Sequence, residues 1–271
     1  MKKEKTCKIV FSDIDGTLLT SDGQITEGTK EMILNLEKKG IPFILTSARS
    51  PEGVRVIKRM LGNHAPIIAF CGGLILDNDG NEIYSKMIPL KRALELKAML
   101  DKDFPAVACN TFGGEKWIVD DRDDWREQRE EKSVGFPAEI GSIKDTFETE
   151  GGIHKFLLMG DSDVMTKLAA VLARDFSDLQ SAASNPEYLE ITAAGVEKSE
   201  GLKTLCGKLG ISLEEAAAFG DGESDLSMMR AAGFGVAMGN APENVRRRAP
   251  MVIGKNDEEG LLKRLKEIFK D

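Results

Sequence analysis

Short apolar runs that alternate with amphipathic helical segments are the feature that most constrains the fold of this chain. Runs rich in β-branched and aromatic residues cover 8–11, 42–46 and 67–70, and apolar residues at helical spacing cover 26–39 and 50–61 between them. Strands and helices that alternate in this way favour a parallel, doubly wound sheet. Ligands of such a sheet bind at the carboxyl ends of its strands, so the residues that follow each strand are the candidate site.

The alternation is interrupted near residue 85 and returns near residue 190. The returning segments are predicted helices at 198–209, 225–232 and 260–269 and a predicted strand at 216–219. Residues 85–189 mix helices and short strands in a less regular order. We therefore expect an α/β fold in which a Rossmann-like, doubly wound parallel sheet core, made from residues 1–84 and 190–271, carries an inserted α+β cap domain at 85–189.

Size and charge narrow the classes of function. A chain of 271 residues fits two domains, at roughly 150 residues for each. The formal net charge of -8 disfavours extended contact with nucleic acid or an anionic membrane, since both need a basic surface. The longest apolar stretch falls well short of the ~20 residues that a membrane helix needs. We expect a protein whose partner is a small molecule.

The four cysteines lie far apart, and no two of them form a Cys-x-x-Cys pair. This spacing predicts neither a zinc site nor a disulfide framework, and it favours a reducing cytoplasm as the location.

Two carboxylates follow the first predicted strand. Asp13 and Asp15 lie two positions apart, where alternate side chains of an extended segment point the same way, and Gly16 allows a tight turn behind them. One carboxylate can act as a covalent nucleophile while its neighbour transfers a proton to or from the reacting oxygen. An acidic surface turn is the alternative. A calcium-binding loop is excluded, because Leu18 occupies the position of the glycine that such a loop requires.

A second acidic cluster, Gly220-Asp221-Gly222-Glu223-Ser224-Asp225, follows the predicted strand at 216–219. Carboxylate oxygens are ligands that Mg²⁺ prefers, and a phosphoryl group needs such a charge before an anionic nucleophile can approach it. Ser47 follows another strand and can donate its hydroxyl to a phosphate oxygen, and Lys198 opens a helix from which its ammonium can neutralise a phosphate. Each of these features alone is common on protein surfaces, and their combination carries the argument.

Together these segments resemble the haloacid dehalogenase superfamily, and within it the Cof-type sugar-phosphate phosphatases with a large α/β cap (subclass IIB). The resemblance covers four motifs in order along the chain: Asp13-Ile14-Asp15-Gly16-Thr17, Ser47 with Arg49, Lys198, and Gly220 to Asp225. The segments Met238-Gly239-Asn240-Ala241 and Asn256-Asp257-Glu258-Glu259-Gly260 are similar to the closing segments of the family.

The resemblance implies a role for each motif. Asp13 is expected to be the nucleophile and Asp15 the general acid and base. Mg²⁺ is expected to be held by Asp13, the backbone carbonyl of Asp15 and Asp221. The phosphate is expected to be bound by Ser47 and Lys198.

The remaining motif residues are expected in supporting positions. Ser224 and Asp225 are expected beside the metal ligands, and Thr17, Arg49 and Asn240 are further candidates for the site. Two positions depart from the family pattern, since Ser224 and Cys71 stand where the family usually has Asn. A serine keeps the oxygen but lacks the amide donor, and Cys71 is not assigned to the site.

The sequence thus predicts a magnesium-dependent phosphatase that hydrolyses a small phosphorylated metabolite, with a sugar phosphate as the family-level expectation, through a phospho-aspartate on Asp13. The alternatives are a phosphotransferase or phosphomutase that uses the same aspartyl-phosphate, and a phosphometabolite-binding protein without turnover. The cap is expected to select the substrate.

Overall fold

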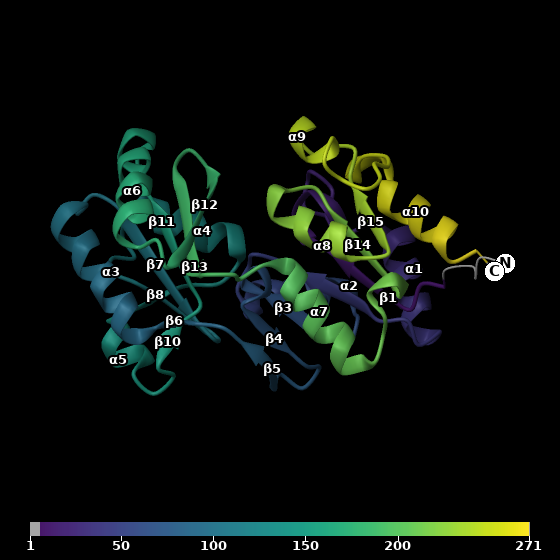
Figure 1. Ribbon diagram of the computed structural model, residues 1–271, viewed down its shortest axis with the longest axis horizontal. Coiled ribbons are helices and arrows are strands. Elements are labelled where there is room, and N and C mark those ends of the chain that lie inside the picture. Colours follow the sequence, from purple (N-terminus) through teal and green to yellow (C-terminus); the bar gives the residue numbers. More distant parts are fainter. Residues whose placement is uncertain (1–5, 271) are drawn as a thin grey trace. The chain divides into compact units, whose positions relative to one another are not determined.

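The computed structural model describes residues 6–270, which form two compact units (Figure 1). The first unit comprises the chain up to Tyr84 together with Glu197 onward, and the second comprises Ser85–Val196. The chain returns to the first unit after Val196 rather than after residue 189, because residues 188–193 form a strand of the second unit's sheet.

The first unit is built around a seven-stranded sheet in the order β15-β14-β1-β2-β3-β4-β5. Pairing is parallel from β15 to β3, and β4 runs antiparallel to β3. Its strands are β1 (Ile9–Ser12), β2 (Phe43–Thr46), β3 (Ile67–Ala69), β4 (Leu74–Leu76), β5 (Glu82–Ser85), β14 (Ala216–Gly220) and β15 (Phe234–Ala237). Every residue of β1, β2 and β14 is buried, as expected of strands that are covered on both faces.

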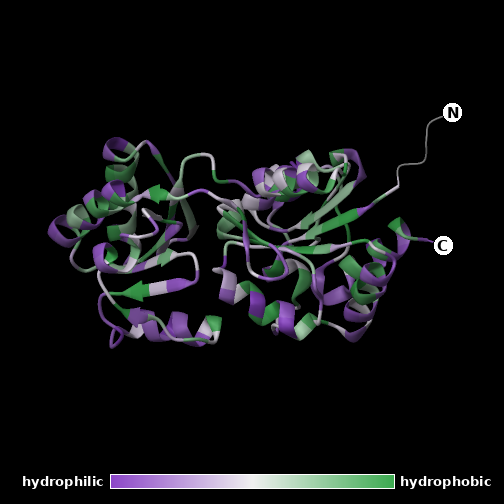
Figure 2. Ribbon diagram, turned by 90° about the horizontal axis from the view of Figure 1, so that it is seen from below, coloured by the Kyte–Doolittle hydropathy of each residue, from purple (hydrophilic) through white to green (hydrophobic). Residues whose placement is uncertain are grey.

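Helices cover the sheet on both sides, and their ends follow from local sequence. They are α1 (Glu27–Lys38), α2 (Pro51–Leu61), α7 (Lys198–Leu209), α8 (Leu226–Ala231), α9 (Glu243–Arg246) and α10 (Gly260–Ile268). Ser50 caps α2 by accepting a hydrogen bond from the Gly53 N–H, and Gly62 ends it with a left-handed φ of 77°. Leu202 and Leu205 of α7 pack on Ile9 and Phe11 of β1, whereas Val10 points to the opposite face and is equally buried. Figure 2 shows mostly hydrophobic strands between helices in which hydrophilic and hydrophobic residues alternate. The predicted doubly wound α/β fold is confirmed.

The second unit is an α+β insertion around a mixed six-stranded sheet in the order β12-β13-β11-β7-β8-β9. Its strands are β7 (Ala108–Gly113), β8 (Lys116–Val119), β9 (Glu139–Ile140), β11 (Lys155–Met159), β12 (Leu179–Asn185) and β13 (Tyr188–Ala193), and β6 (Ile88–Pro89) pairs with β10 (Gly152–Ile153). Its helices are α3 (Leu90–Asp103), α4 (Trp125–Val134), α5 (Ile143–Phe147) and α6 (Ser162–Asp175). Within residues 6–270 no helix is both long and apolar enough to cross a membrane.

The turn η2 (Phe70–Gly72) approaches α7 closely at the end from which Lys198 projects. Phe70, Cys71 and Gly72 all have a positive φ, of 49°, 55° and 102°. A Cβ added to Gly72 would lie 2.3 Å from the Glu197 carbonyl oxygen, so only glycine allows this contact. The start of α7 is therefore set by its packing against a strained turn.

Gly72→Ala should lower the free energy of unfolding by about 2–3 kcal/mol, because the new methyl group would displace the first residues of α7. Gly207→Ala is the matched control, since Gly207 lies on the same helix with no atom within 4 Å of an added Cβ. That control should gain up to about 1 kcal/mol from helix propensity. Urea unfolding of the two variants measures both effects, and equal midpoints for Gly72→Ala and the parent would contradict the role of this contact.

A carboxylic acid is buried in the second unit. Glu127 of α4 is 2% exposed, accepts a hydrogen bond from Asn110 Nδ2 through Oε1 (3.1 Å), and leaves Oε2 without a partner among the described residues. Asn110 in turn accepts a hydrogen bond from Trp117 Nε1 (2.8 Å). Burial raises the pKa of Glu127 from 4.5 to about 8. The folded protein thus binds a proton at neutral pH that the unfolded chain releases.

Glu127→Gln should therefore stabilise the protein increasingly as the pH rises from about 4.5 to about 8, by at most about 1.4 kcal/mol for each pH unit. Below this range Glu127 is protonated in both the folded and the unfolded parent. The difference in free energy of unfolding between Glu127→Gln and the parent should therefore become constant there. Urea midpoints at pH 5 and pH 8 measure it, with the exposed Glu139→Gln on β9 as the control. A gain that is the same at both pH values would show that Glu127 is ionised in the fold.

Candidate active site

Asp13 lies at the carboxyl end of β1, at the centre of the first unit's sheet. Its backbone N–H donates a hydrogen bond to the Phe219 carbonyl oxygen at the end of β14 (2.9 Å), which holds the two strand ends together. Because β1 lies between β14 and β2, the residues that follow these three parallel strands meet at one edge of the sheet. The Asp13 residue is only 7% exposed. A buried carboxylate thus marks this edge.

Lys198, the first residue of α7, joins two of the carboxylates. Its ammonium donates hydrogen bonds to Asp13 Oδ1 (2.7 Å) and Asp225 Oδ1 (2.5 Å), and it is 2% exposed. Asp225 uses its other oxygen to accept hydrogen bonds from the N–H groups of Asp221 (3.0 Å) and Gly222 (2.8 Å). Asp225 therefore orients both Lys198 and the loop that follows β14.

Asp221 completes a cluster of three carboxylates with Asp13 and Asp225. Carboxylate oxygens of the three residues all lie within 4.8 Å of one another. Thr17 donates its hydroxyl to Asp221 Oδ1 (2.9 Å), and a Cβ added to Gly16 would lie 2.4 Å from Asp221 Oδ2. Gly16 is therefore needed for the approach of Asp221 as well as for its own φ of 75°.

Buried negative charge dominates the electrostatics of the cluster. Burial, followed by the charge of Asp225, raises the pKa of Asp13 to about 8, and burial raises the pKa of Asp221 to about 6. Burial alone would lower the pKa of Lys198, but Asp13 and Asp225 outweigh it and raise the pKa well above its ordinary value. One ammonium thus faces three carboxylates. Oxygen donors with excess negative charge fit a hard divalent cation.

Asp15 is directed at Arg49 in this structure. Arg49 donates through Nε to Asp15 Oδ2 (2.8 Å) and through an Nη atom to Asp15 Oδ1 (2.6 Å), and the Asp15 side chain is 57% exposed. The backbone of Asp15 is extended within the turn η1 (Ile14–Leu18). The carboxylate of Asp15 is not part of the three-residue cluster.

Ser47 and its neighbours are fixed by the adjoining loop. Ser47 is 2% exposed, and its Oγ accepts a hydrogen bond from the Arg49 N–H (3.2 Å). The Ser47 N–H donates to the Ile68 carbonyl oxygen, and its own carbonyl oxygen accepts from the Cys71 N–H, both at 2.9 Å. Cys71 thus contributes to the site through its backbone.

Asn240 and Ser224, two further candidates, differ in what they contact. Asn240 donates from Nδ2 to the Gly16 carbonyl oxygen (2.8 Å) and accepts at Oδ1 from the Asn256 N–H (3.1 Å), so it holds the turn behind Asp15. Ser224 is exposed in the short turn η4 (Glu223–Asp225), where Asp225 makes the buried contacts. Asn256, which donates to the Leu19 carbonyl oxygen (2.9 Å), was not among the predicted site residues.

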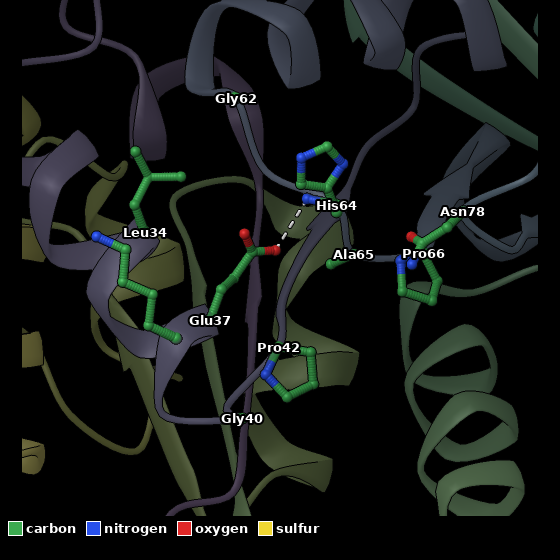
Figure 3. Close-up of a pocket in the computed structure, with 10 residues that line it drawn as sticks. Leu34, Glu37, Gly40, Pro42, Gly62, His64, Ala65, Pro66 and Asn78 are labelled. Atoms are coloured by element: carbon green, nitrogen blue, oxygen red, sulfur yellow. Dashed lines mark hydrogen bonds between the residues drawn. The ribbon is translucent and has the colours of Figure 1, made fainter.

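A separate hollow lies at the opposite end of the strands of the same sheet. It has a volume of about 640 Å³ and is lined by residues that precede β2 and β3, such as Pro42 and Ala65 (Figure 3). His64 borders it and donates its backbone N–H to Glu37 Oε1 (3.0 Å). The carboxylate cluster lies at the carboxyl ends of the strands instead, so we place the candidate active site there.

Comparison with known proteins agrees with this geometry. Residues 10–265 match the family model of haloacid dehalogenase-like hydrolases. The chain is 30% identical to the phosphatase YwpJ of Bacillus subtilis, over 97% of this chain and 100% of that protein. A haloacid dehalogenase-like hydrolase from Bacteroides thetaiotaomicron has a similar structure, with a TM-score of 0.87, 27% identity and coverage of 97% and 100% of the two chains.

The subclass IIB sugar phosphatase BT4131 shares the fold, with a TM-score of 0.80 at 24% identity and coverage of 96% of this chain and 98% of that one. These likenesses extend over both units of the chain. The protein therefore belongs to the haloacid dehalogenase-like hydrolases, and it is a phosphatase of small phosphorylated compounds.

Proposed function

We propose that the protein hydrolyses phosphate monoesters in two steps, through a phospho-aspartate on Asp13. The observation that carries this proposal is the buried ion pair of Asp13 with Lys198 at the carboxyl end of β1. The ammonium fixes one carboxylate oxygen of Asp13 and places a positive charge where a phosphate dianion would bind. Ser47, which is buried beside the same strand ends, is proposed to donate its hydroxyl to the phosphate.

In the first step a carboxylate oxygen of Asp13 forms a bond to phosphorus as the ester oxygen leaves. Asp15 donates a proton to that oxygen, so the product is a neutral alcohol. In the second step Asp15 takes a proton from water, whose oxygen bonds to phosphorus while the bond between phosphorus and Asp13 breaks. Inorganic phosphate leaves, and both aspartates regain their starting forms.

Asp13, the backbone carbonyl of Asp15 and Asp221 are proposed to hold Mg²⁺. When bound, this ion supplies the positive charge that lets a carboxylate approach a phosphate dianion. Asp225 is proposed to support the site indirectly, because both of its oxygens are engaged by Lys198 and by backbone N–H groups. A sugar phosphate is the proposed substrate, as for the structurally similar sugar phosphatase.

Removal of divalent cations should abolish turnover of p-nitrophenyl phosphate, because three clustered carboxylates would then repel the substrate. Added Mg²⁺ should restore it. Release of inorganic phosphate in excess chelator and after titration with Mg²⁺ measures this dependence. Full activity in chelator would exclude the metal assignment.

Asp13→Asn and Asp15→Asn should fail at different steps. Nitrophenolate is a stable anion that hardly needs a proton, so Asp15→Asn should still form the phospho-enzyme and then hydrolyse it slowly. We expect a burst of nitrophenolate that approaches one equivalent per active site, followed by a much slower phase. Asp13→Asn should give no burst, since the nucleophile is lost.

Stopped-flow absorbance at stoichiometric enzyme concentration records both phases. Thr204→Ala, on α7, is the matched control. Its release of nitrophenolate should follow the same time course as that of the parent. Equal bursts from the two Asn variants would contradict the roles assigned to Asp13 and Asp15.

A further inference from the structure

A polar hollow of about 360 Å³ opens beside Asp15 within the first unit. Asp15, Thr20, Arg49, Asn240, Lys255 and Asn256 are among the residues that line it. Its volume suits a group of a few carbon atoms, at the small end of the range for ligand pockets. Because Asp15 is the proposed proton donor to the ester oxygen, the hollow begins next to the part of a substrate that departs.

Hydrogen bonds between distant segments fix the walls of the hollow. Asn240 donates to the Gly16 carbonyl oxygen, and Asn256 donates to the Leu19 carbonyl oxygen. Ser21 donates its N–H and its hydroxyl to the two oxygens of Asp257, each at 2.7 Å. The segments near residues 16–21 and 240–257 are thereby joined, so the hollow has a defined shape before any ligand binds.

Arg49 is built into the wall as a covered cation. Its side chain is 21% exposed, and an added Cβ on Gly53 would lie 3.2 Å from Arg49 Cβ, so the glycine leaves room for its stem. The backbone carbonyl oxygen of Arg49 accepts a hydrogen bond from the Phe70 N–H (3.0 Å). The backbone and the stem of Arg49 are therefore held in place, and its planar guanidinium fork can recognise a group with two oxygens.

In this structure the two-oxygen group is the carboxylate of Asp15, both of whose oxygens face Arg49. To act on an ester, Asp15 has to turn one oxygen toward the departing oxygen atom. An anionic group of a ligand with the same geometry can take the place of Asp15 on Arg49. Lys255, whose side chain is 59% exposed and whose Nζ lies 3.9 Å from Glu258 Oε1, adds a second positive charge to the hollow.

We propose that this hollow binds a second anionic group of the substrate, a carboxylate or a second phosphate, through Arg49 and Lys255. Arg49 passes from Asp15 to that group when the substrate binds, which frees Asp15 to face the ester oxygen. The proposal rests on the phosphatase function above and narrows its substrates to phosphorylated compounds with a second negative charge. Arg49 and Lys255 are then residues that determine specificity.

Matched pairs of esters test the proposal. For the carboxylate, 3-phosphoglycerate is compared with glycerol 3-phosphate, and for the second phosphate, propane-1,3-diol bisphosphate is compared with 3-hydroxypropyl phosphate. For each pair, kcat/KM of the ester with the second anionic group is divided by kcat/KM of the ester without it. This ratio should be about ten or more for at least one pair, as expected of a charge-assisted, two-point contact. The pair with the higher ratio identifies which anion binds.

Variants then assign the ratio to the hollow. Arg49→Gln and Lys255→Gln should bring it toward one through a higher KM for the anionic ester, and Arg49→Lys should restore only part of it because a lysine lacks the fork. Lys208→Gln, an equal change of charge at the exposed end of α7, should keep the parent ratio. A parent ratio near one for both pairs, or an unchanged ratio in Arg49→Gln, rejects the subsite.

Failure of the subsite and failure of the phosphatase proposal give different results. Turnover of p-nitrophenyl phosphate with equal ratios for the ester pairs rejects only the subsite. If p-nitrophenyl phosphate is not hydrolysed, calorimetric binding of 3-phosphoglycerate and glycerol 3-phosphate to the parent and to Arg49→Gln decides the subsite. Tighter binding of the acid by the parent alone supports it, and equal binding overturns it.

Discussion

The buried ion pairs that Lys198 makes with Asp13 and Asp225 are the interactions on which the rest of the site depends. A single charge at this depth is unfavourable, and removal of one partner from a buried pair typically costs about 3–5 kcal/mol. The end of β1, the start of α7 and the turn after β14 must therefore meet with little freedom. The glycines at positions 16 and 72 allow two of the close approaches that this requires.

Much of the fold could be predicted from the sequence because local patterns and burial agree in the first unit. The runs that became β1 and β2 are short, apolar and buried on both faces, and the helical spacing at 50–61 became α2. The strand β15, Phe234–Ala237, was not predicted, since it has four residues with a glycine among them and is defined by its pairing with β14. Residues 188–193 were assigned in part to the wrong unit for a similar reason, because their place depends on antiparallel partners in β11 and β12.

The candidate site was predictable in its residue types and less so in its contacts. Order along the chain and strand ends were enough to bring Asp13, Lys198 and Asp221 to one edge. The direction of a long side chain depends on tertiary neighbours instead, and no local signal indicated that Arg49 would bind Asp15. Asn256 was missed because its partners, Leu19 and Asn240, are distant in sequence.

The position of β1 in the sheet also determines the order in which the protein can assemble during synthesis. One neighbour of β1, β2, is made soon afterwards, but the other, β14, begins at Ala216, after the entire inserted unit. The second unit is continuous from Ser85 to Val196, so it can fold as soon as it leaves the ribosome. The amino-terminal segment must wait for a contact that spans more than two hundred residues, which is the slow kind of contact to form. Asp13, at the end of this segment, thus gains its counter-charge from Lys198 only after the inserted unit has been made.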